Sequence, residues 1–265
     1  MRSPGPAFDL RAAMAHEVRA AITALEQTGA DPNAVHRCRV RLKRARALAR
    51  IGHACAPGLS SVFNDSARSV MALLAHSRDA AALAEAARDA AKHAKKKGAA
   101  ALRAAAAALT AQAQAPHIDL EAANNGLKDL LALAQVWPEA SARQVRKGAR
   151  RLVRRARKGY KTGRAETEIL HRHEWRKREK DRLYGATLLD QAWPGPRRKK
   201  LGDKLGEALG SERDAVLLIA KLKGDPGLAG DGKAPLRAVR ALRKRRKYLA
   251  VHANALGARL HANGV

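Results

Sequence analysis

One basic segment of the chain reads Val35-His36-Arg37-Cys38-Arg39-Val40-Arg41-Leu42-Lys43-Arg44-Ala45-Arg46. A second reads Leu170-His171-Arg172-His173-Glu174-Trp175-Arg176-Lys177-Arg178-Glu179-Lys180-Asp181-Arg182-Leu183-Tyr184. Counted from His36 and from His173, each segment has an arginine at i+3 and a lysine at i+7. Residues at this spacing share one face of an α-helix. The repeated pattern therefore predicts two related cationic helices, with an anionic polymer as their ligand.

The repeat continues beyond these segments, because an Arg-Asp pair follows each of them at a similar distance. From His36 to Asp79 is 43 residues, and from His173 to Asp214 is 41. Two landmarks at nearly equal spacing predict a duplicated helical unit. Each aspartate follows its arginine at a predicted helix start, where a carboxylate stabilises the helix dipole. The alternative is a buried carboxylate that orients basic side chains.

The composition favours an all-helical chain. Hydrophobic residues make up 46% of the 265 residues but aromatic residues only 3%, and much of the apolar content is alanine. Alanine and leucine favour helix, and no segment alternates as a strand would. We therefore predict an all-α fold. Prolines and glycines separate the predicted helices, which are 8–28, 33–55, 60–75, 78–96, 99–114, 118–136, 139–164, 166–191, 198–209, 212–223 and 235–262.

The charge balance points to an anionic partner. Lysine and arginine total 53 against 24 aspartate and glutamate residues, so the formal net charge is +29. Such an excess creates a positive field that attracts anions and repels itself in the compact state. Nucleic acid, inorganic polyphosphate and acidic membrane surfaces all fit this charge. The alternative is a solvated surface that only keeps the protein soluble.

The cysteines and the N-terminus predict a cytoplasmic protein. Cys38 and Cys55 fall in one predicted helix, where about 25 Å separates them, so they cannot pair with each other. A reducing compartment is expected. Residues 1–6 contain no apolar signal-peptide core, and charges interrupt every apolar stretch before it reaches about 18 residues. No membrane partner is therefore expected.

Several predicted helices carry their cations along one face. At 100° per residue, the stripe in 139–164 falls within roughly 80° and runs about 27 Å. The apolar residues of the first basic helix and Trp175 of the second lie on the opposite sides. The candidate anion-binding residues are His36, Arg39, Lys43, Arg44, Arg46 and Arg50; Arg143, Arg146, Arg150, Arg154, Arg157 and Lys161; His173, Arg176, Lys177, Lys180 and Tyr184; and Arg240, Lys244 and Lys247.

Two of the histidines are candidates for contact with phosphate. His36 and His173 begin cationic stripes at equivalent repeat positions, whereas the other histidines are expected to be structural or merely exposed. Surrounding cations should resist protonation of either imidazole, and a bound phosphate should favour it. His171 and His173 point about 200° apart on a helix, so they cannot share a metal ion. No metal and no cofactor is expected.

These segments resemble the CHAD domain family, the conserved-histidine α-helical domain. The first signature is similar to Val35-His36-x-x-Arg39-Val40-x-x-Lys43-Arg44-x-Arg46-Ala47, and the second to His173-Glu174-Trp175-Arg176-Lys177-x-x-Lys180-x-x-x-Tyr184. The two Arg-Asp segments and Gly159-Tyr160-Lys161-x-Gly163-Arg164 fit the same resemblance. The halves differ at position i+8, where the first has Arg44 and the second Asp181.

The resemblance implies one domain over 1–265, built of two similar helical bundles related by pseudo-two-fold symmetry. We expect these halves to be 8–136 and 139–265. It also implies binding of inorganic polyphosphate in a basic groove or pore and association with polyphosphate granules. The candidate anion-binding residues then become polyphosphate contacts.

Two other functions remain open on the residues alone. A histone-like nucleic-acid binder would use the same charge, but aromatic residues for base stacking are scarce and do not interleave with the stripes. An enzyme acting on phosphoanhydrides would need a P-loop, clustered carboxylates for Mg²⁺ or a nucleophile, and the sequence offers none. We therefore predict a non-enzymatic binding protein. The sequence does not specify its oligomeric state.

Overall fold

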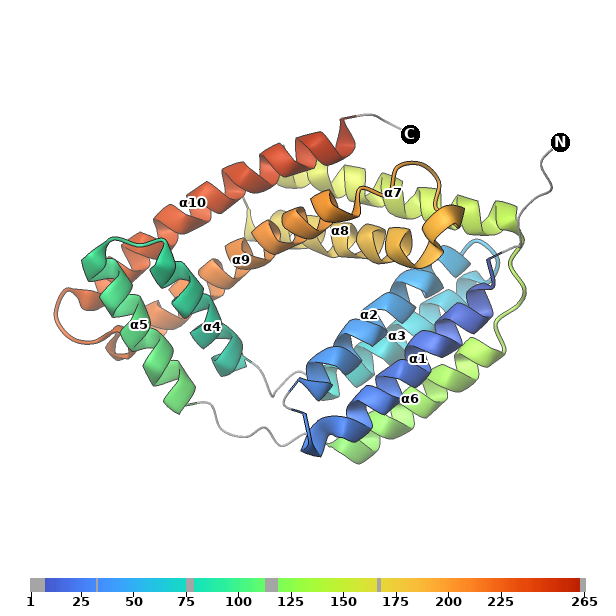
Figure 1. Ribbon diagram of the computed structural model, residues 1–265, viewed down its shortest axis with the longest axis horizontal. Helices are drawn as coiled ribbons and strands as arrows, with labels where there is room; N and C mark the ends of the chain where they lie inside the picture. Colours follow the sequence, from blue (N-terminus) through green and yellow to red (C-terminus); the bar gives the residue numbers. More distant parts are fainter. Residues whose placement is uncertain (1–7, 32, 75–78, 113–118, 166–167, 263–265) are drawn as a thin grey trace.

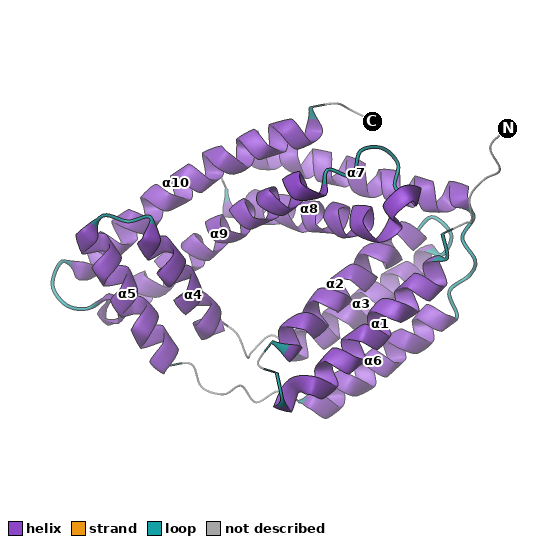
Figure 2. Ribbon diagram, in the orientation of Figure 1, coloured by secondary structure: helices purple, strands orange, loops and turns teal. Residues whose placement is uncertain are grey.

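The computed structural model describes residues 8–31, 33–74, 79–112, 119–165 and 168–262 (Figure 1). Within these ranges the regular structure is entirely helical (Figure 2), which confirms the all-α prediction. The α-helices are α1 Leu10–Glu26, α2 Ala34–Gly52, α3 Pro57–Leu73, α4 Asp79–Lys92, α5 Lys96–Ala111, α6 Leu120–Gln135, α7 Ala142–Ala165, α8 Ile169–Leu189, α9 Lys199–Gly224 and α10 Ala234–His261. Short 3₁₀ turns are η1 Gln27–Gly29, η2 Asp190–Ala192 and η3 Pro226–Ala229.

Local sequence signals explain several helix starts. Asp9 and Asp119 each accept a hydrogen bond from the backbone N–H three residues later, at 2.9 Å. Ser141 and Gln144 form a reciprocal capping box at the start of α7, with Gln144 Oε1 accepting from Ser141 N at 2.9 Å and Ser141 Oγ accepting from Gln144 N at 3.3 Å. These side chains satisfy backbone N–H groups that have no partner inside the helix.

The helices form two packed groups joined by an antiparallel pair. Helices α1, α2, α3 and α6 pack around a core that includes Met14, Phe63 and Trp137. Helices α4, α5, α9 and α10 pack around a core that includes Leu102 and Leu242. The pair α7–α8 packs on α2 at one end and on α9 and α10 at the other, so the chain follows a ring in Figure 1.

This packing crosses the boundary expected between the two halves. Helices α4 and α5 belong to the segment 8–136 in sequence, yet they pack against α9 and α10 of the segment 139–265. The packed groups therefore do not coincide with these two segments. The pseudo-two-fold relation between the halves stays a prediction.

The expected break between 198–209 and 212–223 is wrong, because α9 runs unbroken through Gly210 and Ser211. Leu209, Glu212 and Ala215 continue one buried face across that point. Burying this face outweighs the roughly 1 kcal/mol that a glycine costs inside a helix. Tertiary packing has thus overridden a local helix-breaking signal.

One glycine sets how closely α2 and α7 approach. A Cβ at Gly148 of α7 would overlap the carbonyl oxygen of Ile51 in α2. Beside this contact, Ile51 and Leu152 also meet the backbone of α8 at Gly185. The apolar faces of α2, α7 and α8 therefore join here, and their basic flanks are brought together.

Candidate anion-binding site

A basic cavity of about 740 Å³ lies among α2, α3, α7 and α8. Lysine and arginine side chains from all four helices line it, together with two histidines and two aspartates. Its lining residues are Lys43, Arg46, Arg50, His53, Pro57, Ser60, Ser61, Asn64, Asp65, Arg68, Met71, Arg151, Arg155, His173, Arg176, Lys177, Arg178, Lys180, Asp181 and Tyr184. We refer to this space as the basic cavity.

The two histidine-headed helices meet at this cavity. Helix α2 contributes Lys43, Arg46 and Arg50, and α8 contributes the set from His173 to Tyr184. The apolar side of α2 is buried throughout, as its periodicity predicts, and so is Trp175 of α8. Because these apolar sides pack inward, the cationic flanks of two helices distant in sequence face the same space.

The arginines in the cavity are held close together and partly out of water. Burial, with Arg50 adding repulsion, lowers the pKa of Arg46 to about 10. Burial also lowers the pKa of Arg50 and of Arg155, and neighbouring cations add to the effect. Each guanidinium still carries its charge at neutral pH. A bound anion would relieve the repulsion between these charges. The positive field of the cavity therefore attracts anions.

Asp181 is an internal counter-ion in this cavity. Its carboxylate accepts a hydrogen bond from Arg50 Nη1 at 2.8 Å, and the two side chains are 14% and 18% exposed. Burial raises the pKa of Asp181, whereas Arg50 first and Arg178 next oppose that rise. The ion pair ties α2 to α8 across the cavity. Asp181 stands where the other repeat has Arg44, so at this position a carboxylate paired with Arg50 replaces a cation.

Two histidines of the cavity lie in surroundings that disfavour their protonated forms. Burial first, and then the cations Arg213, Lys177 and Arg176, hold the pKa of His173 below its usual value. The pKa of His53 is lowered by burial and by Arg151. The Nδ1 atom of His173 is buried without a hydrogen-bond partner. These imidazoles can accept a proton when an anion arrives.

The structure places other expected site residues outside the basic cavity. Arg39 donates from Nη1 to the carbonyl oxygen of Met71 at 2.9 Å, and Arg44 forms an ion pair with buried Glu17 at 2.8 Å. His36 is half-buried on α2 but does not line the cavity. The expected stripe of α7 is exposed to solvent along its whole length, at Arg143, Arg146, Arg150, Arg154, Arg157 and Lys161. On α10, Arg240 and Lys244 line a different hollow, and Lys247 is exposed.

Four cationic residues of the cavity are absent from the sequence-based set. These are Arg68 of α3, Arg151 and Arg155 of α7, and Arg178 of α8. The doublets Arg150-Arg151 and Arg154-Arg155 carried a usable signal, since two adjacent arginines lie 100° apart and can serve two different faces. The expected stripe included only the more regular of the two rows.

The prediction that Asp214 stabilises a helix dipole is wrong, because Asp214 lies inside α9 rather than at a helix start. Asp214 instead acts on Arg176 through its charge: burial lowers the pKa of Arg176, and Asp214 opposes this effect. The carboxylate thus neighbours a basic side chain of the cavity, which favours the orienting role. Asp79 begins α4, and its side chain lies outside what the structure describes.

The described residues contain no group of three or more histidine, cysteine, aspartate or glutamate side chains placed to hold a metal ion. Cys38 and Cys55 are free thiols. None of the helices described is both long and apolar enough to cross a membrane.

The basic cavity offers a converging set of guanidinium, ammonium and imidazole groups, which suits the binding of phosphates.

Comparison with known proteins agrees with this architecture. The family model described as the CHAD domain matches residues 12–223. A crystal structure of the CHAD domain from the plant Ricinus communis is similar to this chain with a TM-score of 0.58. The two are 18% identical in sequence, and the match covers 99% of this chain and 96% of that one. None of the curated proteins searched matches the chain.

Proposed function

The chain belongs to the CHAD domain family, and from that premise we propose that it binds inorganic polyphosphate in the basic cavity. The observation that carries the proposal is the meeting of α2, α3, α7 and α8 around one space lined by lysine and arginine. A polyphosphate chain bears negative charge on every unit and offers oxygen acceptors on all sides. Arginine can donate two parallel hydrogen bonds to a phosphate, and lysine acts as a compact point charge.

The ligand chemistry supports polyphosphate over nucleic acid at this cavity. Among the described residues that line the cavity, Tyr184 is the one with a phenol, indole or phenyl ring. The cavity therefore offers little surface on which bases could stack. Charge is its dominant feature. We further propose that this binding directs the protein to cytoplasmic polyphosphate granules, and that it acts as a binding protein without catalysis.

A competition experiment tests the proposed ligand. Labelled long-chain polyphosphate is bound at physiological salt and challenged with duplex DNA at the same phosphate concentration. We expect unlabelled polyphosphate to displace the label and duplex DNA to displace it much less, because the flexible polyphosphate chain can follow the converging cations of the cavity more closely. Equal displacement by both competitors would reduce the interaction to general charge. In parallel, incubation with polyphosphate and Mg²⁺ should release no phosphate.

Polyphosphate binding should strengthen by about tenfold as the pH falls from about 8 to about 6. A bound phosphate chain stabilises the imidazolium forms of His173 and His53, so their pKa values are higher in the complex than in the unbound protein. Binding therefore takes up protons: the gain is complete below the lowered pKa values of the unbound protein and disappears as the pH rises through those of the complex.

The dissociation constant for polyphosphate, measured at several pH values between about 6 and about 8, gives this pH dependence. The double variant His53→Gln and His173→Gln should flatten it, whereas His16→Gln, at an exposed position on α1, should leave it unchanged. A slope that survives the double variant would mean that other groups take up the protons.

A further inference from the structure

A second basic groove follows helix α10 on the side of the molecule away from the basic cavity's helices α2 and α3. It consists of three adjoining hollows of about 700, 660 and 650 Å³. The first two share His93, Arg245 and Tyr248, and the last two share Lys200 and Arg259. We refer to these three hollows together as the α10 groove. None of its described lining residues lines the basic cavity, so the two surfaces are distinct.

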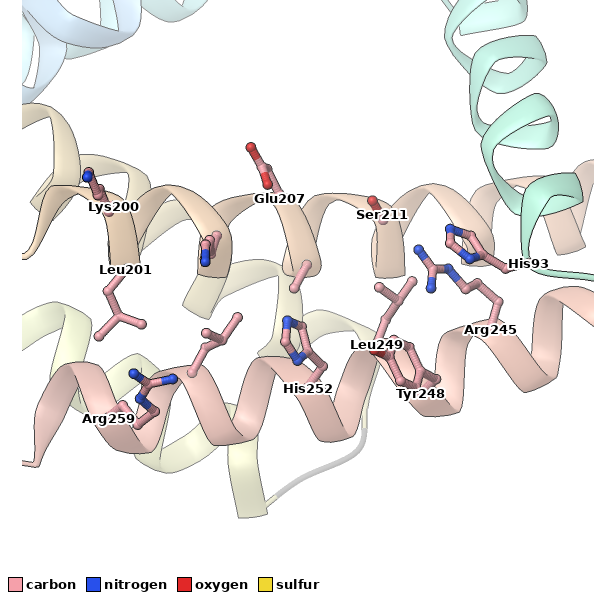
Figure 3. A pocket seen from close by; sticks show the side chains of 13 residues that line it. His93, Lys200, Leu201, Glu207, Ser211, Arg245, Tyr248, Leu249, His252 and Arg259 are labelled. Carbon is pink, nitrogen blue, oxygen red and sulfur yellow. The ribbon is translucent and has the colours of Figure 1, made fainter.

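The α10 groove is strongly cationic along its length. Lys97 and Arg240 lie toward one end, Lys204 lies in the middle, and Arg198 lies at the other end. Glu207 is the one carboxylate among the lining residues that the structure describes. Figure 3 shows its side chain pointing away from α10. The groove therefore attracts a polyanion with little internal neutralisation.

A series of flat side chains distinguishes this groove from the basic cavity. The Arg245 guanidinium lies 5.4 Å from the centre of the Tyr248 ring, and the His252 ring lies parallel to Tyr248, with their centres 6.0 Å apart. All three stand along α10 in the groove (Figure 3). Tyr248 is 59% exposed, although it is a large aromatic residue. Its position leaves flat, partly apolar surface open beside the cations.

Arg245 is not fully neutralised by its neighbours. Its nearest ion pair is with Asp89, at 3.8 Å, and its Nε atom is buried with no hydrogen-bond partner. A buried donor without a partner is costly, so the protein's own groups do not satisfy this guanidinium completely. Arg245 thus combines an unsatisfied donor with a place in the stack of flat groups.

We propose that the α10 groove binds single-stranded nucleic acid. A single strand places phosphates on the cations while its unstacked bases lie against Tyr248 and His252. Inorganic polyphosphate has no flat apolar part and gains nothing from these rings. A duplex hides the faces of its bases within its own stack, so its bases cannot lie against Tyr248 and His252. The proposal does not depend on the function of the basic cavity.

Fluorescence anisotropy with the full chain tests this proposal. The probes are a labelled single-stranded oligoadenylate, an abasic strand of the same length and labelled polyphosphate. At equal salt, oligoadenylate should bind about 5-fold or more tightly than the abasic strand, because only oligoadenylate can stack. Tyr248→Ala should remove this difference while leaving polyphosphate and abasic-strand affinity within about 2-fold of the unmodified protein. Tyr248→Phe, which keeps the ring, should retain most of the affinity for oligoadenylate.

Val251→Ala is the matched control, since Val251 is exposed on the same helix and does not line the groove. It should change no affinity. Equal binding of oligoadenylate and the abasic strand would overturn the proposal. So would a Tyr248→Ala variant that weakens polyphosphate as much as oligoadenylate, because the groove would then belong to a polyphosphate track. The polyphosphate probe separately reports whether the chain binds polyphosphate, so a failure of the proposed function can be told apart from a failure of this proposal.

Discussion

Replacing Lys43, Arg155 and Lys180 together by glutamate should weaken polyphosphate binding by about 100-fold or more. These residues lie on α2, α7 and α8, so the triple variant changes the basic cavity from three sides. Each charge-assisted hydrogen bond contributes about 1.5–3 kcal/mol in a protected site and less near solvent. A loss of about 3 kcal/mol over three positions corresponds to about 100-fold in the dissociation constant. Isothermal titration calorimetry with long-chain polyphosphate measures it directly.

A matched control separates the basic cavity from the general positive charge. The variant Arg143→Glu, Arg150→Glu and Arg157→Glu makes the same change in net charge on the exposed side of α7. It should weaken binding only slightly at physiological salt, because exposed and distant charges are screened. Circular dichroism should show unchanged helicity in both triple variants. Equal losses of affinity would mean that polyphosphate binds to the whole surface and that the cavity has no special role.

The contrast within α7 shows what helical periodicity can and cannot predict. The spacing of its arginines indicates a helix with one cationic face, and Val145 and Leu152 are buried on the other side. Periodicity relates side chains to their own helix axis, but it contains no information about which neighbour covers which flank. In the folded chain, Arg151 and Arg155 face α2 and α8, while the row containing Arg150 faces solvent.

The sequence predicts the helices of the fold more completely than it predicts the residues of the site. Alanine-rich segments separated by proline and glycine predict the helices well, except at Gly210, where packing keeps α9 continuous. The docking of α4 and α5 onto α9 and α10 could not be predicted from local pattern. It depends on complementary apolar faces far apart in the sequence, such as those of Leu102 and Leu242.

A buried ion-pair network explains how the long helices stay together despite the positive charge of the chain. Arg172 of α8 donates from Nε to Glu212 of α9 at 3.0 Å, and from Nη1 to Gly163 of α7 at 3.1 Å and to Asn254 of α10 at 2.7 Å. Its guanidinium also lies 4.9 Å from the Trp175 ring centre. One arginine thus connects four helices, and Glu212 is the carboxylate that balances its charge.

Glu212→Ala should lower the free energy of unfolding by about 3–5 kcal/mol, because it leaves the buried Arg172 charge without its partner. The two side chains are only 6% and 8% exposed, so water cannot replace the lost carboxylate. Glu207→Ala, at an exposed position of the same helix, should change the stability by less than about 0.5 kcal/mol. Urea denaturation followed by circular dichroism gives both values.

The double variant Arg172→Leu and Glu212→Leu identifies the cause of this loss. Removing both charges removes the need to solvate either, so the double variant should be more stable than Glu212→Ala. If the network mainly supplied attraction, the double variant would instead be at least as unstable as the single one. Glu212→Ala with unfolding within about 1 kcal/mol of the unmodified chain would contradict the role of Arg172 as the buried charge that joins α7, α8, α9 and α10.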